Sequence, residues 1–376
     1  MDRPARAQYF GRVEMRGGEH QIQLGHLRHQ LGQVTADAFG QFTGLFGAGL
    51  VLVSGARVVA HDGASALYRP LRIAGRVTIA LLAVEWASQA RLNTLLRELL
   101  GGTTGNPLNL MNRGSVIASL TVWLAATAMA RDTGPWRHPA VAPLFLATAF
   151  LVFLGLTMTV VPVALACGAG LWLVIWLARR RSVRILAAVV ALLAAVAPLL
   201  PRLALDPAAF GARLQALPFS LQHRLHMWNY VAERIAEHPL RGWGVDASRW
   251  FQAGDITMRD LMSSYQFEVQ LLPLHPHNGV LQVWLELGLP GAVLLTAVVV
   301  LLLLGIERYS VSRAAMASGI AVLTTFGVIA GLSYGIWQSW WLATAWLVAA
   351  FAVILAGDRD AVGPADRPGR APGAAA

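Results

Sequence analysis

Lysine is absent from this 376-residue chain, and cysteine occurs once, as Cys167. All 30 basic side chains are therefore arginines. Without lysine, the chain cannot form a Schiff base through a lysine amine, and it cannot build the lysine-containing phosphate loop of P-loop nucleotide hydrolases. A single cysteine excludes an intramolecular disulfide and any zinc or iron–sulfur centre that is held by several thiolates.

Charge is also scarce, because only 13% of the residues are charged while 56% are hydrophobic. A typical soluble domain has about a quarter of its residues charged. The apolar residues occur in blocks close to the length of about 20 that crosses a bilayer. The sequence therefore predicts an all-α, polytopic bundle of membrane-spanning helices. The formal charge of +10 indicates contact with anionic lipid rather than nucleic acid, because the arginines lie mostly beside apolar blocks.

About eight spans are expected. Seven are clear, and they cover residues 114–130, 140–157, 160–178, 185–201, 290–306, 314–333 and 338–356. Two weaker apolar segments, 39–56 and 73–90, precede them, and a single crossing by 73–90 agrees best with the charge pattern. The predicted organisation is an N-terminal region with one or two weak spans (1–113), four spans (114–201), a periplasmic loop with the catalytic segment (202–289), three spans (290–356) and a disordered cytoplasmic tail (357–376).

A short arginine-rich link predicts which side of the membrane each segment faces. It contains Arg179, Arg180, Arg181 and Arg184, and such links between two spans stay in the cytoplasm. Counting spans from this link puts the long stretch 202–289 outside the cytoplasm and the C-terminal tail inside. We therefore expect any chemistry in the long stretch to face the periplasm.

The long stretch opens with a predicted amphipathic helix over residues 220–237, which also carries Arg224. Its apolar side chains recur at helical spacing, and they are Leu225, Trp228, Val231 and Ile235. Arg224 and Trp228 fall on one face of this helix, one turn apart. Spacing alone favours a solvated or headgroup-contacting arginine at position 224 over a binding residue.

A second polar segment surrounds His277, just before the last group of spans. Asn278 is a good N-cap for a short helix that Gly288 can end before the next span, and Gln282 and Glu286 form a polar stripe on it. The positive end of the helix dipole should oppose a charged imidazolium, so His277 is expected to be neutral and able to accept a proton. The alternative is a histidine that packs at the membrane interface. The histidines of this region lack convincing metal-binding spacing.

The pattern His277-Asn278, nine residues, Gly288, two residues and Gly291 resembles the signature of O-antigen ligases and the related O-antigen polymerases. Further points of resemblance are Arg113 at the start of a span, Arg224 with Trp228, Pro239 with Gly242 and Gly244, and the aromatic turn 337–341. Members of the family usually carry more spans than this chain shows.

The resemblance implies a glycosyltransferase of the bacterial inner membrane, active at its periplasmic face in lipopolysaccharide biosynthesis. The donor would be a glycan on undecaprenyl diphosphate, and the acceptor would be lipid A-core. His277 would act as general base, while Arg224 and Arg113 would bind the diphosphate and Asn278 would help to orient the site. Structural roles would fall to Trp228, Gly242, Gly244, Gly288 and Gly291. No metal or other cofactor is implied.

Two other functions stay open at this point. An O-antigen or exopolysaccharide polymerase would use the same donor but a second lipid-linked glycan as acceptor. A membrane transporter is the alternative from another class, although charged residues are scarce within the predicted spans between 114 and 356.

Overall fold

The computed structural model describes residues 56, 65–100, 111–131, 138–178, 181–253, 257–258, 269–310 and 312–357. These residues are helical or in turns, and none of them forms a β-strand, which confirms the all-α class. They fall into two compact units. The first unit takes its described residues from Val190–Val298 and Ser333–Ser339, and the second takes them from Ala48–Val189, Val299–Leu332 and Trp340–Ala376.

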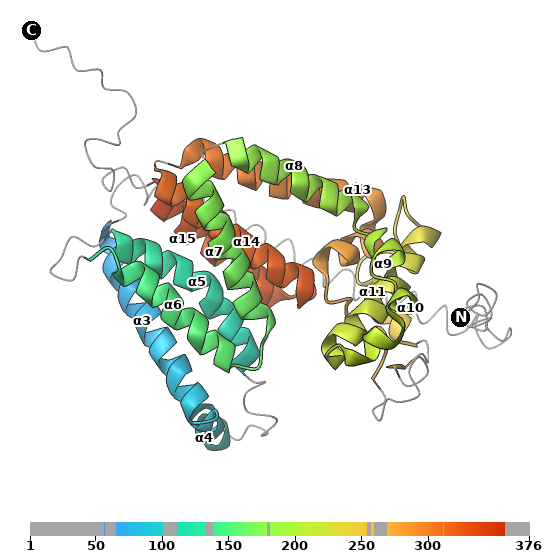
Figure 1. Cartoon of the computed structure of the whole chain (residues 1–376), viewed down its shortest axis with the longest axis horizontal. Coiled ribbons are helices and arrows are strands. Elements are labelled where there is room, and N and C mark those ends of the chain that lie inside the picture. The colour runs from blue at the N-terminus through green and yellow to red at the C-terminus, as the bar shows by residue number, and fades with distance from the viewer. Residues whose placement is uncertain are drawn as a thin grey trace, which may run out of the picture. The chain divides into compact units, whose positions relative to one another are not determined.

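The second unit is a bundle of helices (Figure 1). Its helices are α3 (Ser65–Ala87), α4 (Arg91–Leu99), α5 (Asn112–Ala130), α6 (Val141–Gly155), α7 (Val160–Ala178), the first part of α8 (Arg181–Val196), the end of α13 (Gly279–Tyr309), α14 (Arg313–Leu332) and most of α15 (Ser339–Gly357). α5 packs against α3, α6 and α14, and α14 also packs along α7. Inside the bundle, the Trp123 indole N–H on α5 donates a buried 2.9 Å hydrogen bond to the hydroxyl of Thr325 on α14, so both polar groups have a partner.

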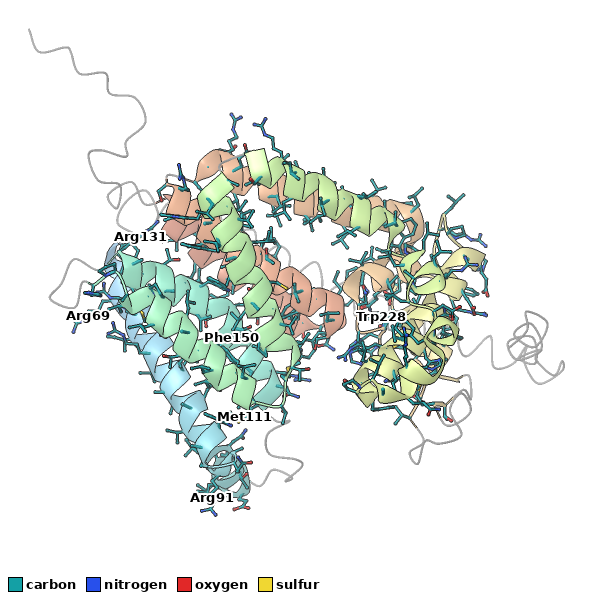
Figure 2. All side chains as sticks on the ribbon, in the orientation of Figure 1. Arg69, Arg91, Met111, Arg131, Phe150 and Trp228 are labelled. Atoms are coloured by element: carbon teal, nitrogen blue, oxygen red, sulfur yellow. The ribbon has the colours of Figure 1, made fainter. Side chains whose placement is uncertain are left out.

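Polar contacts also occur at the ends of this bundle. At one end, where Figure 2 labels Arg69 and Arg131, the guanidinium of Arg131 donates a 2.9 Å hydrogen bond to the hydroxyl of Tyr68. Figure 2 places Met111 and Arg91 at the other end of the same bundle. The apolar flanks between the ends remain uncovered, since Leu144, Leu177 and Leu301 are each more than half exposed. Such flanks suit contact with lipid tails rather than water.

Four helices of the described part are long and apolar enough to cross a membrane: Asn112–Ala130, Val160–Ala178, Gly279–Tyr309 and Arg313–Leu332. Three shorter apolar helices accompany them: Val141–Gly155, Ser182–Val196 and Ser339–Ile354. Each of these helices forms where the sequence predicted a span. The count of about eight spans and the periplasmic side of the long stretch stay predictions. Of the weak segment 39–56, only Ala56 belongs to the described residues, and the tail beyond Gly357 lies outside them.

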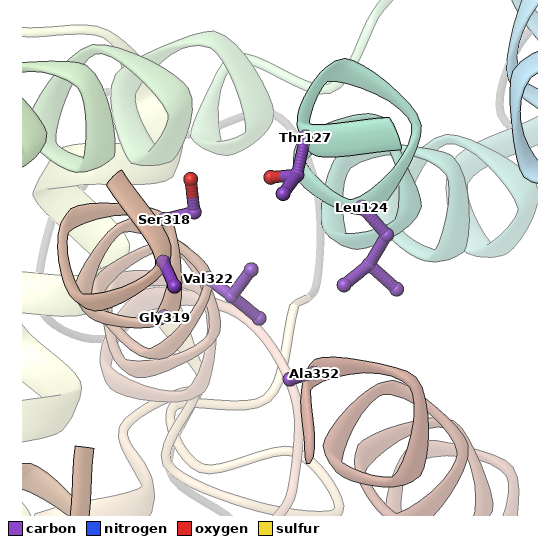
Figure 3. Close-up of a pocket in the computed structure, with 7 residues that line it drawn as sticks. Leu124, Thr127, Ser318, Gly319, Val322 and Ala352 are labelled. Carbon is purple, nitrogen blue, oxygen red and sulfur yellow. The ribbon is translucent and has the colours of Figure 1, made fainter. Parts of the chain in front are cut away.

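A narrow void lies inside the second unit between α5, α14 and α15 (Figure 3). Its volume is about 20 Å³, and Leu124, Val322 and Ala352 supply most of its apolar wall, with the hydroxyls of Thr127 and Ser318 nearby. A space of this size holds no more than a water molecule. It is therefore no site for a glycan or a lipid carrier.

The first unit contains the shorter helices. They are the end of α8 (Arg181–Val196), α9 (Leu200–Leu203), α10 (Pro207–Phe210), the 3₁₀ helices η2 (Gly211–Ala216) and η3 (Ala247–Ala253), α11 (Phe219–Glu237) and the first part of α13 (Gly279–Tyr309). The predicted amphipathic helix is confirmed, because α11 buries the four apolar residues that the sequence pattern selected. The predicted break at Gly288 is also confirmed, since this residue has φ 62° and ψ −154° inside α13.

Candidate active site

Two glycines allow the turn after α11 to lie directly on the break in α13. Gly242 and Gly288 both have positive φ, at 66° and 62°. A Cβ atom on Gly242 would lie 2.5 Å from the backbone of Glu286, and one on Gly288 would lie 2.6 Å from the nitrogen of Gly242. Three backbone hydrogen bonds of 2.9 Å join the segments: Trp243 N to Leu285 O, Gly244 N to Glu286 O and Leu289 N to Pro239 O. The glycine pattern of the sequence therefore encodes a close backbone crossing.

We expect Gly288→Ala to destabilise the protein, because a side chain there combines unfavourable φ with a backbone clash. The positive φ alone costs about 1–3 kcal/mol. Gly305→Ala is the matched control, since a Cβ atom on Gly305 of the same helix meets nothing within 4 Å. Thermal unfolding of the purified proteins is measured by gel filtration of the protein that stays folded at each temperature. The midpoint temperature of unfolding should be lower for Gly288→Ala only. Equal midpoints would contradict the proposed role of the crossing.

The segment before α13 is held at both of its ends. The Asn278 side-chain oxygen accepts hydrogen bonds from the backbone N–H groups of Val280 (3.1 Å) and Leu281 (3.0 Å), which confirms the predicted N-cap. The indole N–H of Trp228 on α11 donates a buried 2.9 Å hydrogen bond to the carbonyl of Pro276. His277 lies between these two anchors with φ 50°, a conformation that side chains other than glycine rarely adopt.

One hydrogen bond defines the tautomer of His277. Its Nδ1 atom lies against the backbone carbonyl of Ser333, at the end of α14. Because a carbonyl can only accept, Nδ1 must carry the proton, and the lone pair of the neutral ring is then on Nε2. No hydrogen bond to Nε2 comes from any residue that the structure describes. Nε2 is therefore the atom that can take a proton from a substrate.

The surroundings of His277 lower its pKa below the ordinary value. Burial is the first cause, because it removes water from the imidazolium. The charge of Arg224, and that of His223 when it is protonated, act in the same direction. The hydrogen bond to Ser333 acts in the opposite direction. The sequence predicted a neutral ring from the helix dipole. The direction is the same, but burial is the larger cause.

Arg224 is half-buried on α11 and is not paired with a carboxylate among the described residues. Its Nη1 donates a 3.1 Å hydrogen bond to the carbonyl of Ser220, and its buried Nε has no partner there. Its charge acts on His277 and on His223, whose pKa values it lowers. An arginine with unused donors beside a neutral histidine suits an anionic ligand.

Three further histidines surround these two residues. The Nε2 atom of His223 lies 3.0 Å and 3.1 Å from the carbonyls of Gln270 and Leu271, and the buried Nε2 of His226 has no partner within the described part of the chain. His275 packs edge-on against His277 with the ring centres 4.4 Å apart, and burial lowers its pKa to about 3. All of them are expected to be neutral at pH 7, so Arg224 supplies the positive charge of the cluster.

Arg113 belongs to the second unit. It lies in the first turn of α5, is exposed, and has its guanidinium carbon 5.6 Å from the ring centre of Trp340. A cation over an aromatic face is a stable resting position for an arginine. Its predicted role in binding the diphosphate stays a prediction, as does a substrate contact by Asn278.

The polar stripe of Gln282 and Glu286 in the sequence predicted no role for Glu286 in the site. The structure buries Glu286 completely and gives its carboxylate four donors. They are the backbone N–H of Asp246 (2.9 Å), the hydroxyl of Ser248 (2.9 Å), the amide of Gln282 (3.0 Å) and the indole of Trp337. Two polar residues one turn apart on an otherwise apolar helix were the only signal for this network.

Comparison with known proteins bears on what this site does. Residues 143–296, which include α11 and the His277 segment, match the family described as O-antigen ligase. A candidate polysaccharide ligase of Rickettsia conorii is 30% identical over 271 residues, which are 71% of this chain and 61% of that protein. These matches place the chain in an O-antigen ligase-like family. The family and the apolar helices together fit a multi-pass membrane protein.

Other relatives of this O-antigen ligase-like protein have the same name. A candidate polysaccharide ligase of Rickettsia prowazekii is 33% identical over 155 residues, 41% of this chain and 37% of that protein. One of Rickettsia typhi is 24% identical over 288 residues, 76% of this chain and 67% of that protein. The chain spans about six tenths of the length of the Rickettsia conorii protein. No solved structure matches it.

Proposed function

We propose that this O-antigen ligase-like protein transfers a polysaccharide from undecaprenyl diphosphate to lipid A-core at the periplasmic face of the inner membrane. The observation that carries the proposal is the contact of His277 Nδ1 with the Ser333 carbonyl, which leaves the Nε2 lone pair available near the positive charge of Arg224. A base and a cation side by side are what the transfer of a glycan from a diphosphate needs. The family match supports the polysaccharide as substrate.

The chemical step would be a single displacement at the anomeric carbon. A hydroxyl of the acceptor sugar attacks this carbon, and its proton moves to Nε2 of His277 as the new carbon–oxygen bond forms. The bond from the anomeric carbon to the diphosphate oxygen breaks, and undecaprenyl diphosphate leaves with the electron pair. One displacement inverts the configuration of that carbon.

The leaving group gains negative charge in this step, and Arg224 would stabilise it. A guanidinium presents a planar set of N–H donors that matches phosphate oxygens. In other enzymes, removing a donor that stabilises the charge of the transition state lowers kcat. The sequence resemblance also assigns a diphosphate contact to Arg113, which belongs to the other unit. The lipid-linked donor carries its own leaving group, so the step needs no nucleotide.

A deletion strain distinguishes the ligase from the polymerase. If the chain is a ligase, deleting its gene should leave long polymer on the lipid carrier and remove it from lipid A-core, because polymerisation is intact. A strain without a polymerase would instead cap the core with single units. Gel separation of lipopolysaccharide and of the carrier-linked pool measures both. Intact surface glycans together with a lost solute uptake would contradict the enzyme and favour a transporter.

A further inference from the structure

We propose that Glu286 is a positioning residue for His277, and that it acts through the segment 333–338, whose first residue accepts the hydrogen bond of the His277 ring. This inference rests on the proposed function, because it assigns a second residue to the same site. Glu286 has no exposed surface, so it cannot touch a substrate. Any effect on the reaction must pass through its neighbours.

The buried carboxylate of Glu286 is stabilised by hydrogen bonds from several segments. A carboxylate without exposed surface is strongly destabilising unless hydrogen bonds replace the water that it loses. No ion pair forms to Glu286 within the described residues. Gln282 donates from one turn earlier on α13, and the other three donors come from parts of the chain far away in sequence. Two of these donors, Asp246 and Ser248, follow α11, and Trp337 follows α14. The carboxylate therefore ties three segments together.

Gln282 extends this connection to the backbone of the segment after α14. Its amide N–H donates to Glu286, and its carbonyl oxygen accepts a 2.9 Å hydrogen bond from the backbone N–H of Ile336. The indole of the next residue, Trp337, also donates to Glu286. Two consecutive residues of the segment are thus fixed to one polar stripe on α13.

The same segment contacts His275 and His277. The carbonyl of Ser333, three residues before Ile336, accepts the Nδ1 proton of His277. Gly335 is pressed against the ring of His275, since a Cβ atom there would lie 2.9 Å from that ring. None of the described residues places a carboxylate in hydrogen-bond contact with His277. The Ser333 carbonyl therefore does what an aspartate does in a Ser-His-Asp triad, and Glu286 holds that carbonyl in place.

The test compares Trp337→Phe and Glu286→Gln with the unchanged chain in lipid nanodiscs, using undecaprenyl-diphosphate-linked polysaccharide and lipid A-core. We expect kcat per folded protein to fall about tenfold to a hundredfold with an unchanged KM, as for other residues that orient a functional histidine. The acid limb of kcat/KM should also move to lower pH. The sign follows because the Ser333 hydrogen bond raises the pKa of His277, so its loss lowers that pKa.

Trp284→Phe is the matched control. It also removes one indole hydrogen bond of α13, the 2.9 Å bond to the carbonyl of Ala194, but it does not touch the segment after α14. It should leave the pH profile unchanged. If Trp337→Phe and Glu286→Gln lower only the yield of folded protein, with kcat and the pH profile as in the control, the inference is overturned. A fully active His277→Ala variant would instead overturn the proposed function.

Discussion

Replacing His277 with alanine should lower the rate of glycan transfer by about 10²- to 10⁴-fold, the usual contribution of a general base. The reason is that a sugar hydroxyl is a poor nucleophile and Nε2 of His277 is the acceptor available for its proton. Transfer is measured from lipid-linked polysaccharide to lipid A-core, with equal amounts of folded protein. In cells, the same variant should fail to restore the lipopolysaccharide ladder of a deletion strain.

His138→Ala is the control for this experiment. His138 is exposed and lies just before α6 in the second unit, where its Nδ1 accepts a 3.2 Å hydrogen bond from the backbone of Ala140. This variant should keep full activity. A complete ladder from the His277→Ala strain would show that the ring takes no proton in the reaction.

Replacing Arg224 with glutamine should have the second largest effect, a loss of about 10²- to 10³-fold, because the leaving diphosphate then lacks a fixed positive charge. The substitution should also change the pH dependence. The charge of Arg224 disfavours the imidazolium form of His277 and lowers its pKa, so its removal raises that pKa. The acid limb of kcat/KM should therefore move to higher pH, opposite to the shift expected for Trp337→Phe.

Arg213→Gln is the control, since Arg213 is an exposed residue of η2 in the same unit. It should reproduce the rate and the pH profile of the unchanged chain. A loss of rate in Arg224→Gln with no shift of the acid limb would mean that Arg224 and His277 do not interact electrostatically in the working enzyme. An unchanged rate of transfer would show that Arg224 does not stabilise the leaving diphosphate.

Local features of the site could be predicted from the sequence, because they depend on neighbouring residues. The side chain of Asn278 caps its own helix, Gly288 breaks it ten residues later, and α11 buries one stripe of its surface. Each of these features follows from short-range geometry. The apolar blocks likewise predicted where helices form, although their sequence alone does not fix how many cross the bilayer.

The long-range contacts could not be predicted. The partner of His277 is a backbone carbonyl, and any residue type at position 333 would offer one, so the sequence carries no mark of it. The same holds for the backbone N–H of Asp246 at Glu286. The side chains of Ser248 and Trp337 reach Glu286 only when the turn after α11 and the segment after α14 meet on α13. The dominant cause of the lowered His277 pKa, burial, depends on the same packing.

The most direct test of the account is transfer by the purified chain in proteoliposomes. The chain is supplied with undecaprenyl-diphosphate-linked polysaccharide and lipid A-core, without nucleotide, and the products are separated by gel and by lipid extraction. We expect polysaccharide covalently joined to lipid A-core, together with release of undecaprenyl diphosphate, and loss of both products in His277→Ala. Lengthened polymer that remains on the lipid carrier, with none on lipid A-core, would contradict it.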